Sequence, residues 1–462
     1  MRSGLLQRVL AIAQHSRPHS HAPNSAGFLG PSSRTFSQTS PAHQESNSGA
    51  PPRGKLPFVI QTKGVPVHLY AHPDEVENDA IKQLIGIAES PLPVAYVSAM
   101  PDVHLGKGVT IGSVFASEKY VCPNAVGVDI GCGMCAVLVK DLTKHDVTRQ
   151  QLERMQKMLK MRVPVGFNQH RTPLPGAKHA LEEISQLKPP TKRLESVFRK
   201  NPKIANQLGT LGGGNHFLEV VYDELDRVWV MLHSGSRNVG NTSAQFHDEV
   251  AKNLLRSKGL RAQIPGLNYM EIESREGQEY LKDMEWCQGY AMRNRAFMRD
   301  IMVEVVNEVT GKDPDMEHAI NIHHNYCNCE RCTYTDPRTG ETVDKKLWVT
   351  RKGATSALDG QYGIIPGSMG TGSYITKGKG EAKAWSSCSH GAGRRMSRTK
   401  AFKAVPQGEF ETAMAGIVCD THPKVKDEAP QAYKDLQTVM ENQTDMVDVV
   451  HRLKPLLNVK GF

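Results

Sequence analysis

The stretch Val228-Trp-Val-Met-Leu-His-Ser-Gly-Ser-Arg237 carries the pattern that decides the fold. Its first five residues are apolar and include β-branched and aromatic side chains, which is typical of a buried strand. A histidine follows directly, and the Ser and Gly residues after it end the strand. The stretch therefore predicts a strand that delivers His233 into a polar turn, where functional side chains are often found.

The regions around this strand predict a mixture of strands and helices. Apolar runs predict two further strands, at Pro93–Ser98 and Ala136–Val139. Helical periodicity predicts four helices, at Glu75–Glu89, Thr148–Met161, Ser243–Ser257 and Gln278–Val309. Gly311 follows the last helix, as is typical of a helix C-terminus. No break in composition follows Leu56, so we predict one α+β domain over residues 55–462, with sheets flanked by helices and an active site in Gly-rich loops.

The first 54 residues have a different character. Residues 1–44 contain four arginines and no acidic residue, in a chain whose formal net charge is +9. An amphipathic start followed by Ser- and Pro-rich sequence predicts a mitochondrial transit peptide and linker over residues 1–54. A cytosolic tail is the alternative, and the protein would then be cytoplasmic. The sequence has no apolar run of about 18 residues, so we expect no membrane-spanning helix.

The nine cysteines are scattered and odd in number, which favours metal binding or packing over disulfides. Asp129 and Cys132 lie among three glycines in Gly127-Val-Asp-Ile-Gly-Cys-Gly133, so both side chains can point to one spot. Three histidines lie in comparable settings: His216 in a Gly-rich turn, His233 at its strand end, and His324 in Asn-Ile-His-His-Asn. A single such histidine is more often an ordinary polar residue, but three beside an Asp/Cys pair suit zinc, manganese or iron. Whether one or two ions bind stays open.

Two later segments indicate phosphate chemistry. Pro366-Gly-Ser-Met-Gly-Thr-Gly-Ser373 is rich in backbone amides and hydroxyls, which predicts a nest for an anion, although it is not a Walker A loop. In Ser389-His-Gly-Ala-Gly-Arg-Arg-Met-Ser-Arg398, small residues leave room around His390 and the arginines offer forked donors to phosphate. A basic surface loop is the alternative for the second segment.

Seven strings in this order resemble the RtcB family of RNA ligases, over a region from about Lys63 to Gly461. They are Met100-Pro-Asp-Val-His-Leu-Gly106, Asp129-Ile-Gly-Cys132, Gly214-Asn-His-Phe-Leu-Glu219, His233-Ser-Gly-Ser-Arg237, His324-Asn325, Pro366-Gly-Ser-Met-Gly370 and His390-Gly-Ala-Gly-Arg394. The resemblance implies an enzyme that uses GTP to join an RNA 3′-phosphate or 2′,3′-cyclic phosphate end to a 5′-hydroxyl end through a guanylylated histidine.

The resemblance also implies a role for each matching residue. His390 is implied as the nucleophile. The implied ligands of two Mn²⁺ ions are Asp129, the bridging Cys132, His216, His233 and His324. The implied guanylate pocket consists of Asn215, His216, Phe217, Leu218, Glu219, His324, Asn325, Pro366, Gly367, Ser368, Met369, Ser373, His390, Gly391, Ala392, Gly393, Tyr433 and Lys460. The implied RNA-phosphate contacts are Arg237, Arg394 and Arg398.

Two features depart from the tRNA-splicing members of the family. Archaeal and animal forms carry Asp-Ile-Asn-Cys where this chain has Asp129-Ile-Gly-Cys132, a form seen in many bacterial members, so RNA repair is as good an expectation as tRNA splicing. An apparent insertion holds Cys327, Cys329 and Cys332. Cys329 and Cys332 have the spacing of one half of a zinc knuckle, but the other half is missing, so we expect free thiols in a hairpin. A metal-dependent RNA-end phosphoesterase and a non-catalytic RNA-binding scaffold are the competing functions. The sequence does not identify the RNA, an activating protein partner or the oligomeric state.

Overall fold

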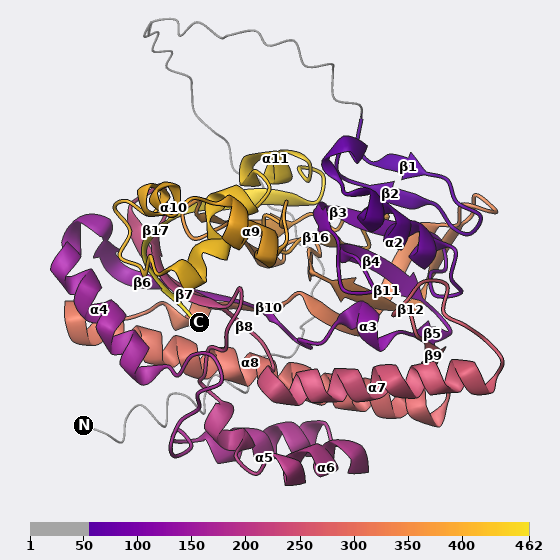
Figure 1. The fold of residues 1–462 in the computed structure, drawn as a ribbon, viewed down its shortest axis with the longest axis horizontal. Coiled ribbons are helices and arrows are strands. Elements are labelled where there is room, and N and C mark those ends of the chain that lie inside the picture. Colours follow the sequence, from indigo (N-terminus) through magenta and orange to yellow (C-terminus); the bar gives the residue numbers. More distant parts are fainter. Residues whose placement is uncertain (1–54, 462) are drawn as a thin grey trace, which may run out of the picture. The chain divides into compact units, whose positions relative to one another are not determined.

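A computed structural model describes residues 55–461, and two large sheets organise this part of the chain (Figure 1). The predicted transit peptide and linker lie outside the described residues. A seven-stranded antiparallel sheet has the order β10-β6-β8-β7-β17-β15-β14. Its strands are β6 Gly133–Thr143, β7 Phe217–Tyr222, β8 Arg227–Ser234, β10 Ile320–His323, β14 Tyr362–Pro366, β15 Ser373–Gly378 and β17 Val447–Lys460.

The second sheet has six strands in the order β1-β2-β3-β4-β12-β11, of which only β2 and β3 are parallel. Its strands are β1 Phe58–Ile60, β2 Val67–Leu69, β3 Val97–His104, β4 Ile111–Ser117, β11 Asn325–Thr335 and β12 Thr342–Lys352. Two short pairs complete the strands: β13 Ala354–Ser356 with β16 Ser387–Ser389, and β5 Tyr120–Val121 with β9 Met270–Glu271.

Helices cover the sheets and connect them. The described helices are α2 Asn78–Ala88, α3 Pro123–Val126, α4 Arg149–Arg162, α5 Ala177–Leu187, α6 Lys192–Lys200, α7 Arg237–Ser257, α8 Arg275–Thr310, α9 Arg398–Ala404, α10 Gln407–Ala413 and α11 Leu436–Glu441. Figure 1 shows α7 and α8 running along the same side of the molecule. Side chains of α4 and α8 pack with those of β6, β7 and β8 in a shared apolar core. No helix among residues 55–461 is both long and apolar enough to cross a membrane.

The α+β prediction is confirmed, and most predicted elements are present with shifted ends. Helix α8 ends at Gly311, whose φ of 72° is the left-handed conformation that favours glycine at a helix end. The strand predicted from Pro93 is wrong at its start, because β3 begins only at Val97. Pro91 and Pro93 lack the amide hydrogens that a paired strand needs, so the chain before Val97 stays irregular.

The hairpin prediction for the inserted cysteines is confirmed. Strands β11 and β12 pair along their whole lengths, and Cys327, Cys329 and Cys332 of β11 are free thiols. In the described part of the chain, no cluster of possible metal ligands includes these three cysteines.

Candidate active site

The register of four neighbouring strands brings the predicted metal ligands to one place. Residue Phe217, which follows His216, pairs with His233, and His233 in turn pairs with Met134 of β6. On the other side of β6, Gly133, which follows Cys132, pairs with His323 of β10. The sheet order therefore places Cys132, His216, His233 and His324 together, although they are up to 192 positions apart in sequence.

The donor atoms of these residues converge within hydrogen-bonding distances. The Sγ atom of Cys132 lies 3.4 Å from Nε2 of His216 and 3.2 Å from Nε2 of His233. The Nε2 atoms of His233 and His324 are 3.2 Å apart, and Asp129 Oδ2 lies 3.0 Å from His216 Nε2. All five predicted ligands therefore belong to one cluster, and its Cys132, His216 and His233 atoms are close enough to share an ion.

Backbone carbonyls set the tautomers of two of these histidines. His216 Nδ1 lies 2.8 Å from the carbonyl oxygen of Leu211, and His233 Nδ1 lies 3.2 Å from that of Asn215. A carbonyl oxygen only accepts, so Nδ1 carries the hydrogen and Nε2 keeps its lone pair toward the cluster. Burial lowers the pKa of His233 and of His324 well below the usual value, which favours the neutral, metal-binding form. The residues present thus fit a divalent metal.

A buried arginine holds the loops that carry these ligands. Arg295 of α8 is fully buried, and its Nη1 donates to the carbonyl oxygens of Gly131 at 2.7 Å and Ser234 at 3.0 Å. Its Nε donates to Asn321 Oδ1 at 2.7 Å. One guanidinium therefore ties together the segments next to Cys132, His233 and His324. Burial raises the pKa of the Cys132 thiol, and the charge of Arg295 opposes that rise.

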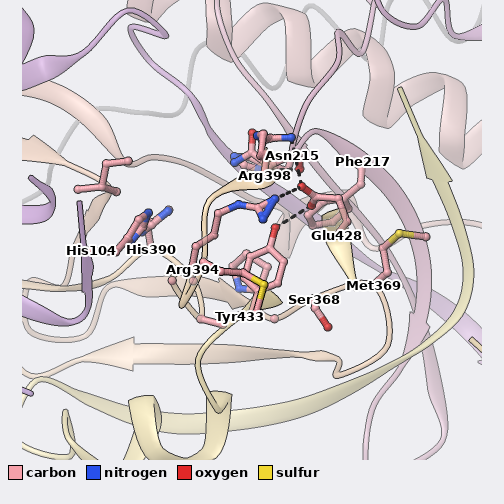
Figure 2. Close-up of a pocket in the computed structure, with 18 of the residues that line it drawn as sticks. His104, Asn215, Phe217, Ser368, Met369, His390, Arg394, Arg398, Glu428 and Tyr433 are labelled. Carbon is pink, nitrogen blue, oxygen red and sulfur yellow. Dashed lines mark hydrogen bonds and ion pairs between the residues drawn. The ribbon is translucent and has the colours of Figure 1, made fainter. Parts of the chain in front are cut away.

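A cavity of about 400 Å³ adjoins the cluster (Figure 2). Most of the predicted guanylate-pocket residues line it: Asn215, Phe217, Glu219, Pro366, Gly367, Ser368, Met369, Ser373, His390, Gly391, Ala392, Gly393, Tyr433 and Lys460. The metal-cluster residue His233 also lines the cavity, and the rings of His324 and His390 meet edge to face with centroids 4.9 Å apart. The predicted nucleophile therefore stands between the cavity and the metal cluster.

His390 is oriented by a buried carboxylate that the sequence analysis did not single out. Oδ2 of Asp102, on β3, lies 2.6 Å from His390 Nδ1 and also accepts the backbone amides of His390 at 3.1 Å and Gly391 at 3.3 Å. The Asp102 side chain has no exposed surface. A carboxylate beside Nδ1 favours the hydrogen on that nitrogen and leaves Nε2 as the nucleophilic atom. Gly393 has to be glycine, because a Cβ there would lie 2.2 Å from the Asp102 carbonyl oxygen.

A second buried carboxylate organises the opposite side of the cavity. Glu428 accepts hydrogen bonds of 2.8 Å from Arg394, Tyr433 and Lys460, as Figure 2 shows for the first two. Burial acts to raise the pKa of Glu428, but the charges of Lys460, Arg398 and Arg394 outweigh it and lower that pKa to about 2. Glu428 was missed because its partners come from distant segments.

Some predicted site residues point elsewhere. Leu218 is fully buried in the core beneath the sheet, because side chains alternate along β7 and only Phe217 and Glu219 face the cavity. Asn325 does not line the cavity, since its amide group accepts from Gly353 N at 2.8 Å and donates to the Asp129 carbonyl oxygen at 3.3 Å. Arg237 donates to Thr210 Oγ1 at 3.1 Å and to the Gly166 carbonyl oxygen at 2.6 Å.

The loop between β14 and β15 uses several of its own backbone donors. The amides of Gly367, Ser368, Gly370 and Thr371 donate within the loop, so fewer amides are available to an anion than its sequence suggests. Ser368 and Met369 of this loop line the cavity.

The chain matches one family of known proteins. The family described as tRNA-splicing ligase RtcB matches residues 83–461. The RNA-splicing ligase RtcB of Escherichia coli K12 is 39% identical, over 87% of this chain and 99% of that protein. The tRNA-splicing ligase RtcB of Methanococcus maripaludis is 30% identical, over 84% of this chain and 92% of that protein. The Mycobacterium tuberculosis H37Rv RNA-splicing ligase RtcB is also 30% identical, over 82% of this chain and 100% of that protein.

These matches define the class of protein as an RNA ligase. The chain belongs to the RtcB family, which confirms the resemblance that the sequence motifs indicated.

Proposed function

We propose that the protein uses GTP and two Mn²⁺ ions to join RNA 3′-phosphate or 2′,3′-cyclic phosphate ends to 5′-hydroxyl ends, with GMP carried on His390. The observation that carries this proposal is the place of His390, whose Nδ1 contacts Asp102 while its ring meets His324 of the metal cluster. A histidine that is only structural would not need an open cavity on one side and five metal donors on the other.

The donor cluster would hold the metal ions. The Cys132 sulfur lies within 3.4 Å of one histidine and 3.2 Å of another, which supports the proposal that a thiolate bridges two ions. Manganese accepts mixed thiolate, imidazole and carboxylate donors, and the bound ions would supply positive charge for the phosphates. The choice of manganese over zinc or iron is part of the proposal.

The covalent step follows from the orientation of His390. Its Nε2 attacks the α-phosphorus of GTP; an N–P bond forms, the α–β phosphoanhydride bond breaks and pyrophosphate leaves. Asp102 stabilises the imidazolium that results, because its negative charge lies 2.6 Å from His390 Nδ1. An oxygen of the RNA 3′-phosphate then attacks the GMP phosphorus and displaces His390. Finally the 5′-hydroxyl oxygen attacks the RNA 3′-phosphorus, loses its proton, and GMP leaves.

A terminal 2′,3′-cyclic phosphate would need a preceding step. Water would open the ring to a 3′-phosphate, which then enters the sequence above.

The cavity offers groups for the guanine and its phosphates. Glu219 and Lys460 lie on adjacent strands, β7 and β17, and Asn458 donates to Glu219 Oε1 at 2.7 Å. Carboxylate acceptors suit the two N–H groups on the pairing edge of guanine, and an ammonium donor suits a guanine oxygen or a phosphate. Tyr433 adds an aromatic face to the cavity wall. Arg394 and Arg398 are proposed to receive RNA phosphates.

The adduct itself is the test. The protein is incubated with α-labelled GTP and Mn²⁺, and we expect an acid-labile covalent GMP adduct that peptide mapping assigns to His390. The His390→Ala variant should lose the adduct and the joining reaction but keep its metal content and fold. It should still join RNA whose 3′-phosphate was guanylylated in advance, because that step no longer needs the nucleophile.

The alternatives give different results in the same experiment. A phosphoesterase would form no adduct in the wild-type protein, and a scaffold would show no metal-dependent chemistry. Mapping of GMP to His104, whose ring stacks 6.4 Å from that of His390, would overturn the assignment. The RNA substrate and an activating protein partner are separate questions from this test.

A further inference from the structure

Phe167 lies in the loop between α4 and α5 and is completely exposed, with a relative accessibility of 107%. Among the exposed large apolar side chains of residues 55–461, none is more exposed. A single exposed apolar side chain is common on a protein surface, so the position of this ring relative to the active site decides whether it can bind a ligand.

The backbone on both sides of Phe167 is anchored. Asn168 N donates to the Val165 carbonyl oxygen at 3.1 Å, which closes a turn with Phe167 near its tip, and Gly166 adopts a φ of 63°. On the far side of the turn, His170 N donates to Asn206 O at 3.0 Å, and Asn206 Nδ2 donates back to His170 O at 2.9 Å. The fold therefore presents the ring on a fixed support, so little conformational freedom of the loop is lost when a ligand binds.

The turn that carries Phe167 contacts a second loop, which leads into the active site. Gly166 N donates to Gly212 O at 2.7 Å, and the Gly166 Cα would lie 3.8 Å from a Cβ on Gly213. Gly213 is three residues before the metal ligand His216, at most about 11 Å along an extended chain. Phe167 therefore stands within a few nucleotides' length of the reacting centre.

The path between the ring and the active site suits a single-stranded polyanion. Gly212, Gly213 and Gly214 carry no side chains, so a sugar–phosphate backbone can lie close to them. Arg237 fills the space beside Gly212 and is bound to Thr210 and Gly166, but the Arg398 guanidinium would lie 3.3 Å from a Cβ on Gly214. Arg171, four residues after Phe167, is exposed. Cations that follow a backbone path and an aromatic ring beside it are the features of a single-strand binding groove.

We propose that Phe167 is a stacking platform for a base near the RNA end, with the RNA backbone crossing the Gly212–Gly214 segment toward the metal cluster. This inference rests on the proposed function, since it needs an RNA end in the active site. A phenyl face stacks on any base, so Phe167 contributes affinity for single-stranded ends without reading sequence.

The test compares three variants of the full chain. Phe167→Ala removes the ring, Phe167→Trp keeps an aromatic face, and Tyr362→Ala removes a half-exposed aromatic ring at the end of β14 away from Pro366. The probes are a fluorescent single-stranded RNA with a 3′-phosphate, measured by anisotropy, and the labelled GMP adduct, measured without RNA.

We expect Phe167→Ala to weaken RNA binding and raise the KM for RNA by roughly five- to one-hundredfold, the range that loss of one base–aromatic stack produces. Adduct formation should be unchanged, and Phe167→Trp and Tyr362→Ala should bind RNA like the wild type. Unchanged RNA affinity in Phe167→Ala would overturn the stacking role. A change in sedimentation instead of RNA affinity would show that the ring is a protein contact, and equal losses in Tyr362→Ala would show a non-specific effect. A wild-type protein without any adduct would refute the proposed function instead, independently of these comparisons.

Discussion

Replacement of Asp102 by asparagine should slow guanylylation of His390 and leave the fold intact. The Asp102 Oδ2 atom accepts hydrogen bonds from the amides of His390 and Gly391 and lies 2.6 Å from His390 Nδ1. An asparagine oxygen in the same place can accept both amides, so the loop geometry should survive. What the variant loses is the negative charge 2.6 Å from a ring that becomes positive when GMP is attached.

Two limits bracket the size of this effect. The full Coulomb attraction at 2.6 Å is about 6 kcal/mol at an effective dielectric constant of about 20, which is an upper limit. A hydrogen bond to a charged group contributes about 1 kcal/mol more than a neutral one, which is a lower limit. A loss of about 3 kcal/mol lies between them and corresponds to guanylylation on the order of 100-fold slower.

The rate is measured in a single turnover with α-labelled GTP, under conditions where the adduct forms faster than it is consumed. Metal content and GTP affinity of Asp102→Asn serve as controls, because neither the metal cluster nor the nucleotide groups are altered. An adduct that forms at the wild-type rate would refute the reasoning, since it would mean that the charge of Asp102 contributes nothing to the transition state. A loss of metal would show instead that the variant disturbs the neighbouring cluster.

Three further outcomes test other parts of the site and the leader. Cys132→Ser should bind Mn²⁺ at least about tenfold more weakly and lose ligation, because a hydroxyl bridges two ions poorly. Metal analysis that shows two tightly held ions in an active variant would contradict this. Burial raises the pKa of Glu219 to about 7, so its neutral form stabilises the fold in acid and that contribution is lost as pH rises through 7. The ionised form of Glu219, which would accept hydrogen bonds from guanine, becomes more populated as pH rises. Calorimetry should therefore show GTP affinity falling by up to about tenfold per pH unit below 7, whereas Glu219→Gln should show no such dependence. Residues 1–54 fused to a fluorescent reporter should direct it to mitochondria, and a diffuse cytosolic signal would count against the proposed transit peptide.

The parts of the site that could be predicted from sequence are those that local patterns mark. His233 follows an apolar run, and Cys132 and His216 lie among glycines, so His233 could be assigned to a strand end and the other two to turns before the fold was known. Their meeting point could not be derived from these patterns, because it depends on the order β10-β6-β8-β7, in which neighbours are distant in sequence. The family resemblance supplied that information.

The residues that were missed are buried charges whose partners are remote. Asp102 lies in a strand among apolar residues, and Arg295 lies in the middle of a helix rich in charged residues, where an arginine usually faces solvent. Asp102 lies in one of the strings that resemble the family, but neither residue has a local signal of its role. Glu428 is similar, since its partner Lys460 comes from the last strand. Such residues become visible only when the tertiary contacts are known.

The position of the site at the seam between the two sheets explains why these buried charges are needed. β10 of the seven-stranded sheet ends at His323 and β11 of the six-stranded sheet begins at Asn325, so the ligand His324 is the single residue between them. His390, in contrast, is held by Asp102 of the six-stranded sheet. His390 itself follows β16 of a separate two-stranded sheet, so its position relative to the metal ligands depends on Asp102, and a small slide of the six-stranded sheet would separate them. Arg295 fixes the loops that carry the metal ligands, and Asp102 fixes the loop that carries the nucleophile. Each makes several hydrogen bonds through one buried charge. Such bonds resist a slide better than separate neutral contacts would.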